Sequence, residues 1–134
     1  MADRMAKLTG RRGSSERYAY LPRKMLKSLA YITLPHATRS YLTALAAECN
    51  GFNNGRIKFT REVAESYGLR SAGTRTRCLK ELESHGFIRF TAKVKGPNPH
   101  RHCDLIRLTW QQMYEYRDWN LPEMSPTNEW DEWQ

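Results

Sequence analysis

The sequence contains no hydrophobic run long enough to cross a membrane. Its longest apolar stretch, Leu29 to Leu34, includes Thr33, whereas a membrane-spanning helix needs about 20 apolar residues. No apolar segment follows the charges near the N-terminus, so no secretory signal is visible. These absences argue against a membrane-spanning or secreted protein. We expect a cytoplasmic protein, located in the bacterial nucleoid or the host cytoplasm.

Cysteine is also scarce. Three cysteines, Cys49, Cys78 and Cys103, are an odd number without repeated spacing, which argues against a disulfide framework. Cys49 and Cys78 fall on apolar helix positions, which indicates reduced thiols in a core. Cys103 lies beside His100 and His102, but no C-x-x-C pair accompanies them, and a structural zinc site takes four ligands. We therefore expect no metal and no cofactor.

No catalytic motif is recognisable. Ser, His and Asp residues are present, but none lies in a nucleophile turn, and no Gly-rich phosphate loop is found. The sequence predicts a binding protein rather than an enzyme.

Positive charge is what the sequence has in excess. The 134 residues carry 22 Lys and Arg against 14 Asp and Glu, a net charge of +8 at pH 7. The excess lies in residues 1–110, whereas residues 111–134 hold one basic residue and six acidic ones. A basic body favours a polyanionic partner, nucleic acid ahead of membrane.

Composition divides the chain into three parts, and its length leaves room for one compact domain plus extensions. Residues 1–17 are polar and basic, which predicts a flexible arm, and residues 18–119 form the predicted domain, with Trp119 packed on it. Residues 120–134 are acidic and include Trp130 and Trp133, which predicts a mobile tail. Such a tail either binds a protein partner or serves as a solubilising end.

Hydrophobic periodicity and turn residues predict the elements of the domain. In order, they are a short helix from Pro22 to about Leu29, a helix from Pro35 to Asn50 with Tyr41, Leu42, Leu45 and Cys49 on its buried face, a strand over 56–59, a helix capped by Thr60, a turn at 68–69, a helix from the Ser71 cap to His85, strands over 87–95 and 104–109, and an amphipathic helix over 110–119. This predicts an α+β, mainly α fold: a winged helix-turn-helix with a small antiparallel sheet of three strands and terminal extensions.

The helix that follows Ser71 is predicted to enter the major groove of DNA. Cys78, Leu79 and Leu82 mark its inward face, and the opposite face is polar and basic. Arg77 and Thr74 are expected at base edges, because Arg can hold guanine O6 and N7 in a bidentate pair. Arg70, Ser71 and Lys80 are expected to bind phosphate, and Gly73 is expected to allow close approach of the backbone to the DNA. Thr76 lies on the same outward face. The alternative is an ordinary solvated helix face.

Arg75 interrupts this pattern. It stands four residues before Leu79, where an apolar residue would be expected. Either its side chain runs along the edge of the core toward phosphate, or the helix is rotated slightly from this placement.

The segment between the last two strands is predicted to be the wing. Its prolines and glycine suit a tip that lies along phosphates or enters the minor groove. The basic residues of the wing include Arg89 on its first strand. The expected DNA contacts are Lys93, Lys95, His100, Arg101 and His102. The alternative is a solvated hairpin that binds nothing.

Residues 21–110 resemble a family of small winged-helix proteins of bacterial mobile elements, phages and plasmids. The motifs that carry the likeness are L-P, N-G-F-N-N-G, I-K-F-T, L-K-E-L-E-S-H-G-F-I and R-L-T-W, within about two-thirds of the chain. The resemblance implies DNA binding by a transcriptional regulator or a replication-associated factor. Arg75 departs from the apolar residue usual there, and the acidic tail looks peculiar to this protein.

Three functions follow from this sequence. The first is a sequence-preferring double-stranded DNA-binding protein, which as a homodimer would read half-sites about 10 base pairs apart. The second is a phage- or plasmid-encoded protein-binding module, such as an inhibitor of a host defence or polymerase complex, with the winged helix as scaffold and the tail as contact. The third is nonspecific architectural binding, with steep salt dependence and little sequence preference.

Overall fold

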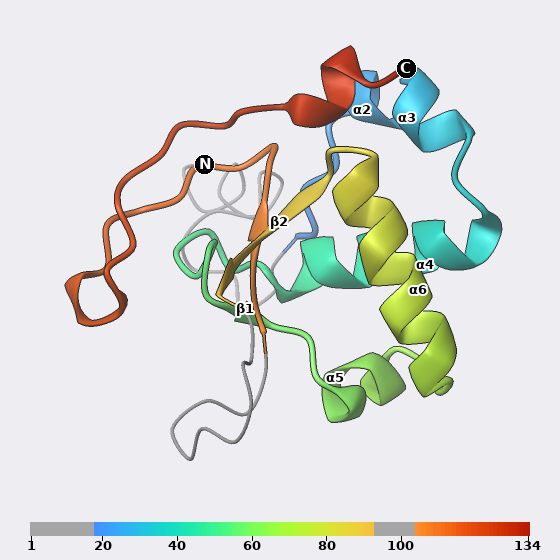
Figure 1. Cartoon of the computed structure of the whole chain (residues 1–134), viewed down its shortest axis with the longest axis horizontal. Helices are drawn as coiled ribbons and strands as arrows, with labels where there is room; N and C mark the ends of the chain where they lie inside the picture. Colours follow the sequence, from blue (N-terminus) through green and yellow to red (C-terminus); the bar gives the residue numbers. More distant parts are fainter. Residues whose placement is uncertain (1–17, 93–103) are drawn as a thin grey trace, which may run out of the picture.

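The computed structural model describes residues 18–92 and 104–134 (Figure 1). The elements of these segments, in chain order, are α2 (Arg23–Leu26), α3 (Leu29–Ile32), α4 (His36–Glu48), β1 (Ile57–Lys58), α5 (Arg61–Ser66), α6 (Ala72–Ser84), β2 (Ile88–Ala92), β3 (Leu105–Leu108), and the 3-10 turns η1 (Arg117–Trp119) and η2 (Glu129–Glu132). The fold is α+β, and its three described strands form one antiparallel sheet in the order β1-β3-β2, as predicted.

The short helix predicted after Pro22 is two separate helical turns, α2 and α3. They separate at Ser28, whose backbone is extended at φ −74° and ψ 157° and whose side chain accepts a hydrogen bond from the Tyr31 amide. The hydroxyl therefore starts a new helix instead of continuing the old one. Met25 and Ala30 remain fully buried, so both turns pack on the core.

The core lies between α4, α6 and one face of the sheet. The predicted buried face of α4, consisting of Tyr41, Leu42, Leu45 and Cys49, is buried in the structure. Across the sheet, Ile57 pairs with Ile106 and Ile88 pairs with Leu108, and all four side chains are buried. Figure 1 shows α4, α5 and α6 together on one side of the sheet.

A buried asparagine ties the turn before β1 to the end of β3. The Asn54 side chain is 1% exposed, and its amide nitrogen donates to the backbone oxygens of Leu108 and Gln111 at 3.0 Å each. Its Oδ1 accepts from the Leu108 amide at 2.6 Å. These bonds fix the position of the sheet edge formed by β1.

The helix predicted over residues 110–119 is wrong. Antiparallel backbone bridges join Met113 to Met124 and Tyr116 to Leu121 instead, and Asn120 turns the chain in the left-handed region at φ 52°. Residues 113–124 therefore form a narrow hairpin. The apolar residues that suggested an amphipathic helix also fit this hairpin, because here too some of them face the core and others face solvent.

The tail expected to be mobile packs against the body. Amides of Thr127 and Asn128 donate to the Thr109 oxygen at 2.9 and 3.0 Å, and Trp130, only 4% exposed, belongs to the main core. Burial of so large a ring contributes roughly 1.5–3 kcal/mol, which holds the segment in place. Trp119, expected to pack on the domain, is 39% exposed.

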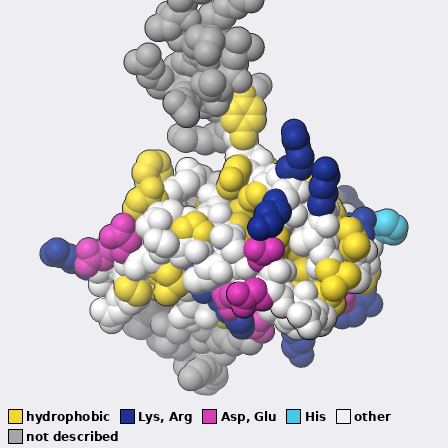
Figure 2. All heavy atoms as spheres, turned by 90° about the horizontal axis from the view of Figure 1, so that it is seen from above, with side chains coloured by type: hydrophobic (Ala, Val, Ile, Leu, Met, Phe, Trp, Pro, Cys, Tyr) yellow, Lys and Arg dark blue, Asp and Glu magenta, His cyan; other side chains and the backbone are white. Residues whose placement is uncertain are grey.

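The C-terminal turn η2 lies beside α2 and α3 (Figure 1). Lys24 on α2 forms an ion pair with Asp131 at 3.2 Å. Figure 2 looks onto this end of the molecule and shows hydrophobic, basic and acidic side chains interspersed on it.

Candidate nucleic-acid interface

Two capped helices position the candidate interface. Thr60 caps α5 by accepting from the Val63 amide at 3.3 Å, and Ser71 caps α6 by accepting from the Thr74 amide at 3.2 Å. Gly68, at φ 81°, makes the turn between the helices. The start of α6 is thus fixed by local hydrogen bonds.

One face of α6 lies in the core. Cys78 and Leu82 are fully buried, and Leu79 packs against the core while partly exposed. The Thr38 hydroxyl of α4 donates to Cys78 Sγ at 3.3 Å. The inward face is therefore the predicted one.

The opposite face of α6 is open to solvent. The structure places on it, or at its N-terminal end, the DNA contacts predicted for this helix, and the exposed ones are Arg70, Ser71, Gly73, Thr76, Arg77 and Lys80. Thr74 differs from the others because it is half-buried. Ser71 already uses its oxygen as the helix cap.

The basic residues of this face differ in their present partners. Arg77 lies 3.7 Å from Glu81 one turn along the helix, with 63% of its side chain exposed. Arg70 and Lys80 form no ion pair with any residue of the two described segments. A long ion pair such as Arg77–Glu81, between an exposed arginine and a half-buried acid one helical turn away, contributes about 0–1 kcal/mol, so an anion can displace Glu81 at little cost.

Arg75 lies along the edge of the core, which is the first of its two predicted placements. Its guanidinium binds a backbone oxygen of the chain instead of reaching outward. Its Nη1 donates to the Phe59 oxygen at 3.1 Å, and its Nε is buried without a hydrogen-bond partner in the described segments. Arg75 therefore connects α6 to the chain that enters α5. We assign it a structural role.

The predicted wing contacts Lys93, Lys95, His100, Arg101 and His102 lie outside the described residues. Arg89, grouped with them from the sequence, is described and is engaged elsewhere. Its Nε donates to Glu129 at 2.7 Å, and this hydrogen bond raises the pKa of Arg89. The Arg89 bond is also the main cause that lowers the pKa of the Glu129 carboxyl.

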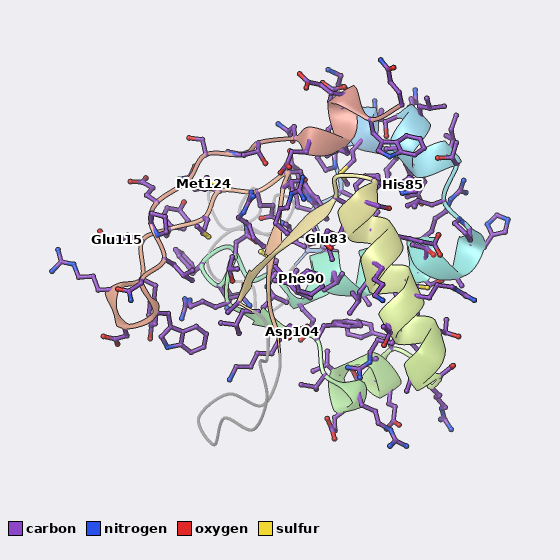
Figure 3. All side chains as sticks on the ribbon, in the orientation of Figure 1. Glu83, His85, Phe90, Asp104, Glu115 and Met124 are labelled. Atoms are coloured by element: carbon purple, nitrogen blue, oxygen red, sulfur yellow. The ribbon has the colours of Figure 1, made fainter. Side chains whose placement is uncertain are left out.

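Both tryptophans considered as partner contacts are used within the chain. Trp130 is in the core, and Trp133 stacks on His85 with ring centroids 4.1 Å apart. Figure 3 shows His85 at the end of α6, beneath the C-terminal turn. A partner could reach the Trp130 ring only after the segment had left the core.

Sequence reasoning missed a second cluster of aromatic and basic residues. The Arg56 guanidinium lies 3.9 Å from the centre of the Tyr116 ring, and Lys58 Nζ lies 5.6 Å from that of Trp119. Residues 56–58 and 116–119 meet only because the hairpin folds back on β1. No local pattern in the sequence signals this contact.

In the described segments, no group of three or more His, Cys, Asp or Glu side chains could hold a metal ion. Nor is any helix of residues 18–92 and 104–134 both long enough and apolar enough to traverse a bilayer. Comparison of the chain with protein-family models, with curated proteins and with solved structures yields no match. Any functional assignment therefore depends on the geometry of this chain alone.

Proposed function

We propose that the protein binds double-stranded DNA with a preference for sequence, as a transcriptional regulator or replication-associated factor. In this proposal the outward face of α6 enters the major groove, and the chain between β2 and β3 serves as the wing. The order α4, β1, α5, α6, β2, β3 supports the proposal, because a winged helix-turn-helix has this order of elements. The activity is binding and occlusion rather than chemistry.

The single observation that carries the proposal is the division of α6 into two faces. Its inner face is fixed in the core by Cys78 and Leu82, while Arg77 and Lys80 project from the outer face. The 13 residues of α6 form a rod about 20 Å long, and the major groove, about 12 Å wide, admits an α-helix.

The roles of the outer residues follow from their chemistry. Arg77 exchanges its half-buried Glu81 partner for guanine O6 and N7, a pairing that contributes about 1–3 kcal/mol of discrimination. Arg70 and Lys80 bind phosphate, which sets register without reading sequence. Gly73 allows the backbone of the first helical turn to approach the DNA closely.

Selection from a random duplex library, followed by affinity measurements on the enriched duplex and a scrambled one, tests the proposal. Arg77→Ala should weaken binding to the enriched duplex by about 1–3 kcal/mol and relax its preference. Glu81→Gln is the matched control, because it removes the same ion pair but leaves Arg77 in place. It should bind at least as tightly as the wild type.

Two results would overturn the proposal. One is the absence of any enriched sequence together with only weak, salt-sensitive binding, which would leave nonspecific association. The other is unchanged affinity and preference in folded Arg77→Ala and Lys80→Ala proteins, which would remove α6 from the interface.

A further inference from the structure

A strip of aromatic rings, all of them exposed except the half-buried Tyr116, runs along the β1 edge of the molecule and onto the hairpin of residues 113–124. We define this aromatic strip as Phe52, Tyr114, Tyr116 and Trp119, together with the cations Arg56 and Lys58. Phe52 is 67% exposed, Tyr114 47% and Trp119 39%. Such a concentration of exposed rings marks an interaction surface more often than an isolated exposed residue does.

Contacts within the strip hold its rings in a fixed arrangement. Phe52 and Tyr114 have ring centroids 6.0 Å apart, and Tyr116 and Trp119 meet edge to face at 5.8 Å. Arg56 links the two pairs, because it lies over the Tyr116 ring and donates to the Phe52 oxygen at 3.0 Å. The rings are therefore held in place before any ligand arrives.

Charge indicates what kind of ligand fits. The strip and its hairpin carry the three bases Arg56, Lys58 and Arg117 and the three acids Glu115, Asp118 and Glu123. This balance provides little net attraction for the phosphates of a duplex. A ligand bound here gains its affinity from the ring faces, supplemented by the two cations already placed against them.

We propose that the aromatic strip binds unpaired nucleotides by stacking their bases on its rings. Bases in a duplex stack on one another and present no free face, whereas unpaired bases stack on aromatic side chains with little dependence on sequence. In Figure 1, β1 lies between the hairpin and the lower end of α6. The strip and α6 occupy different places on the molecule, so a duplex at α6 and its unpaired end at the strip can be bound together, and the preferred ligand is a duplex with an unpaired end.

This inference rests on the proposed function in one respect only: α6 is expected to bind the duplex part of the ligand. The test therefore uses three labelled probes: a blunt duplex, the same duplex with an oligothymidine overhang of about ten nucleotides, and the oligothymidine alone. Binding is followed by fluorescence anisotropy at near-physiological salt. The wild type should bind the overhang duplex more tightly than the blunt one.

Trp119→Ala should reduce affinity for the overhang duplex by roughly 5- to 150-fold, the range for loss of one stacked base, and leave blunt-duplex affinity unchanged. Phe52→Ala, a change in the loop before β1 that leaves the hairpin sequence intact, should have the same effect even if Trp119→Ala disturbs the hairpin. The control is Tyr18→Ala, which removes a ring outside the strip whose exposure (59%) lies between those of Phe52 and Trp119. It should bind all three probes like the wild type.

The possible failures are distinguishable. If the wild type binds the blunt and overhang duplexes equally, or if both strip variants keep the preference for the overhang, the strip does not bind unpaired nucleotides. Loss of self-association in Trp119→Ala without any change in DNA binding would assign the strip to a second copy of the chain and overturn the proposal. Oligothymidine binding without duplex binding would support the strip and contradict the function proposed for α6.

Discussion

The two glycines at opposite ends of α6 are under different constraints. Gly73 lies in the first turn, and a Cβ atom built there meets nothing within 4 Å. Gly86 has φ +85°, and a Cβ atom there would lie 2.6 Å from the Trp130 nitrogen. At Gly86, both the left-handed backbone and the C-terminal segment require the absence of a side chain.

Alanine at these positions should therefore have effects of opposite sign. Gly73→Ala should raise the free energy of unfolding by up to about 1 kcal/mol, because it favours the helix. Gly86→Ala should lower it by more than about 1 kcal/mol. Denaturant unfolding followed by circular dichroism measures both. A destabilised Gly73→Ala protein would mean that the space around the first turn is filled.

At the same scale, Arg75 and Arg77 show how far side-chain roles can be predicted from the sequence. Helical spacing alone placed Arg77 outside, because Cys78 and Leu82 define the opposite face. The same spacing left Arg75 ambiguous, since its acceptor, the Phe59 oxygen, lies 16 residues away. Contacts between elements that are distant in sequence are not visible in a local pattern.

At the scale of the elements, the C-terminal segment places a carboxylate beside two arginines that face each other in the sheet. Arg89 and Arg107 are direct partners across β2 and β3, and like charges in that arrangement repel. Glu129 lies between them, bonded to Arg89 and 3.6 Å from Arg107. Burial lowers the pKa of Arg107, and the adjacent carboxylate offsets the penalty of burying its charge.

Because Arg89 and Thr127 donate hydrogen bonds to Glu129, the pKa of its carboxyl is lower in the folded chain than in the unfolded one. Glu129 therefore stabilises the fold above the usual glutamate pKa, and this contribution is lost as the pH falls through its folded pKa. Glu129→Gln should reduce the free energy of unfolding at pH 7 by about 1–3 kcal/mol. It should also make stability less sensitive to acid.

Unfolding measured from neutral to acidic pH tests this expectation, with Glu132→Gln as the control. Glu132 is an exposed acid of the same turn. Superimposed stability curves for Glu129→Gln and the wild type would show that the two arginines do not need the carboxylate.

Elements were predictable from the sequence to different degrees. The helix from Pro35 and the helix after Ser71 have an apolar face and a definite start, and both form where predicted. The hairpin at 113–124 was misjudged, because Met113 pairs with Met124, and ten residues separate the two in the chain. The tail was misjudged because Trp130 is buried against residues far away in the chain, whereas an acidic composition alone favours disorder.

For the whole molecule, most of the net charge lies outside the described segments. Residues 1–17 carry five bases and two acids, and residues 93–103 carry three bases and no acid. These stretches account for +6 of the net +8. The described body is close to neutral, so in the proposed complex α6 would provide a few directed contacts rather than a strong general attraction for DNA.

If the protein binds duplex DNA, its salt dependence and its sequence preference should depend on different residues. Each phosphate contact steepens the fall of log affinity with log salt by about 0.9. Replacing both Arg11 and Arg12 by Gln should weaken binding to enriched and scrambled duplexes alike and make this slope shallower. Arg77→Ala should instead reduce the ratio between the two affinities and leave the slope nearly unchanged.

A double variant at the exposed Lys24 and Arg117 removes the same net charge from other parts of the surface. If it flattened the slope as much as the Arg11 and Arg12 variant, the attraction would come from total charge rather than from the basic segment at residues 1–17.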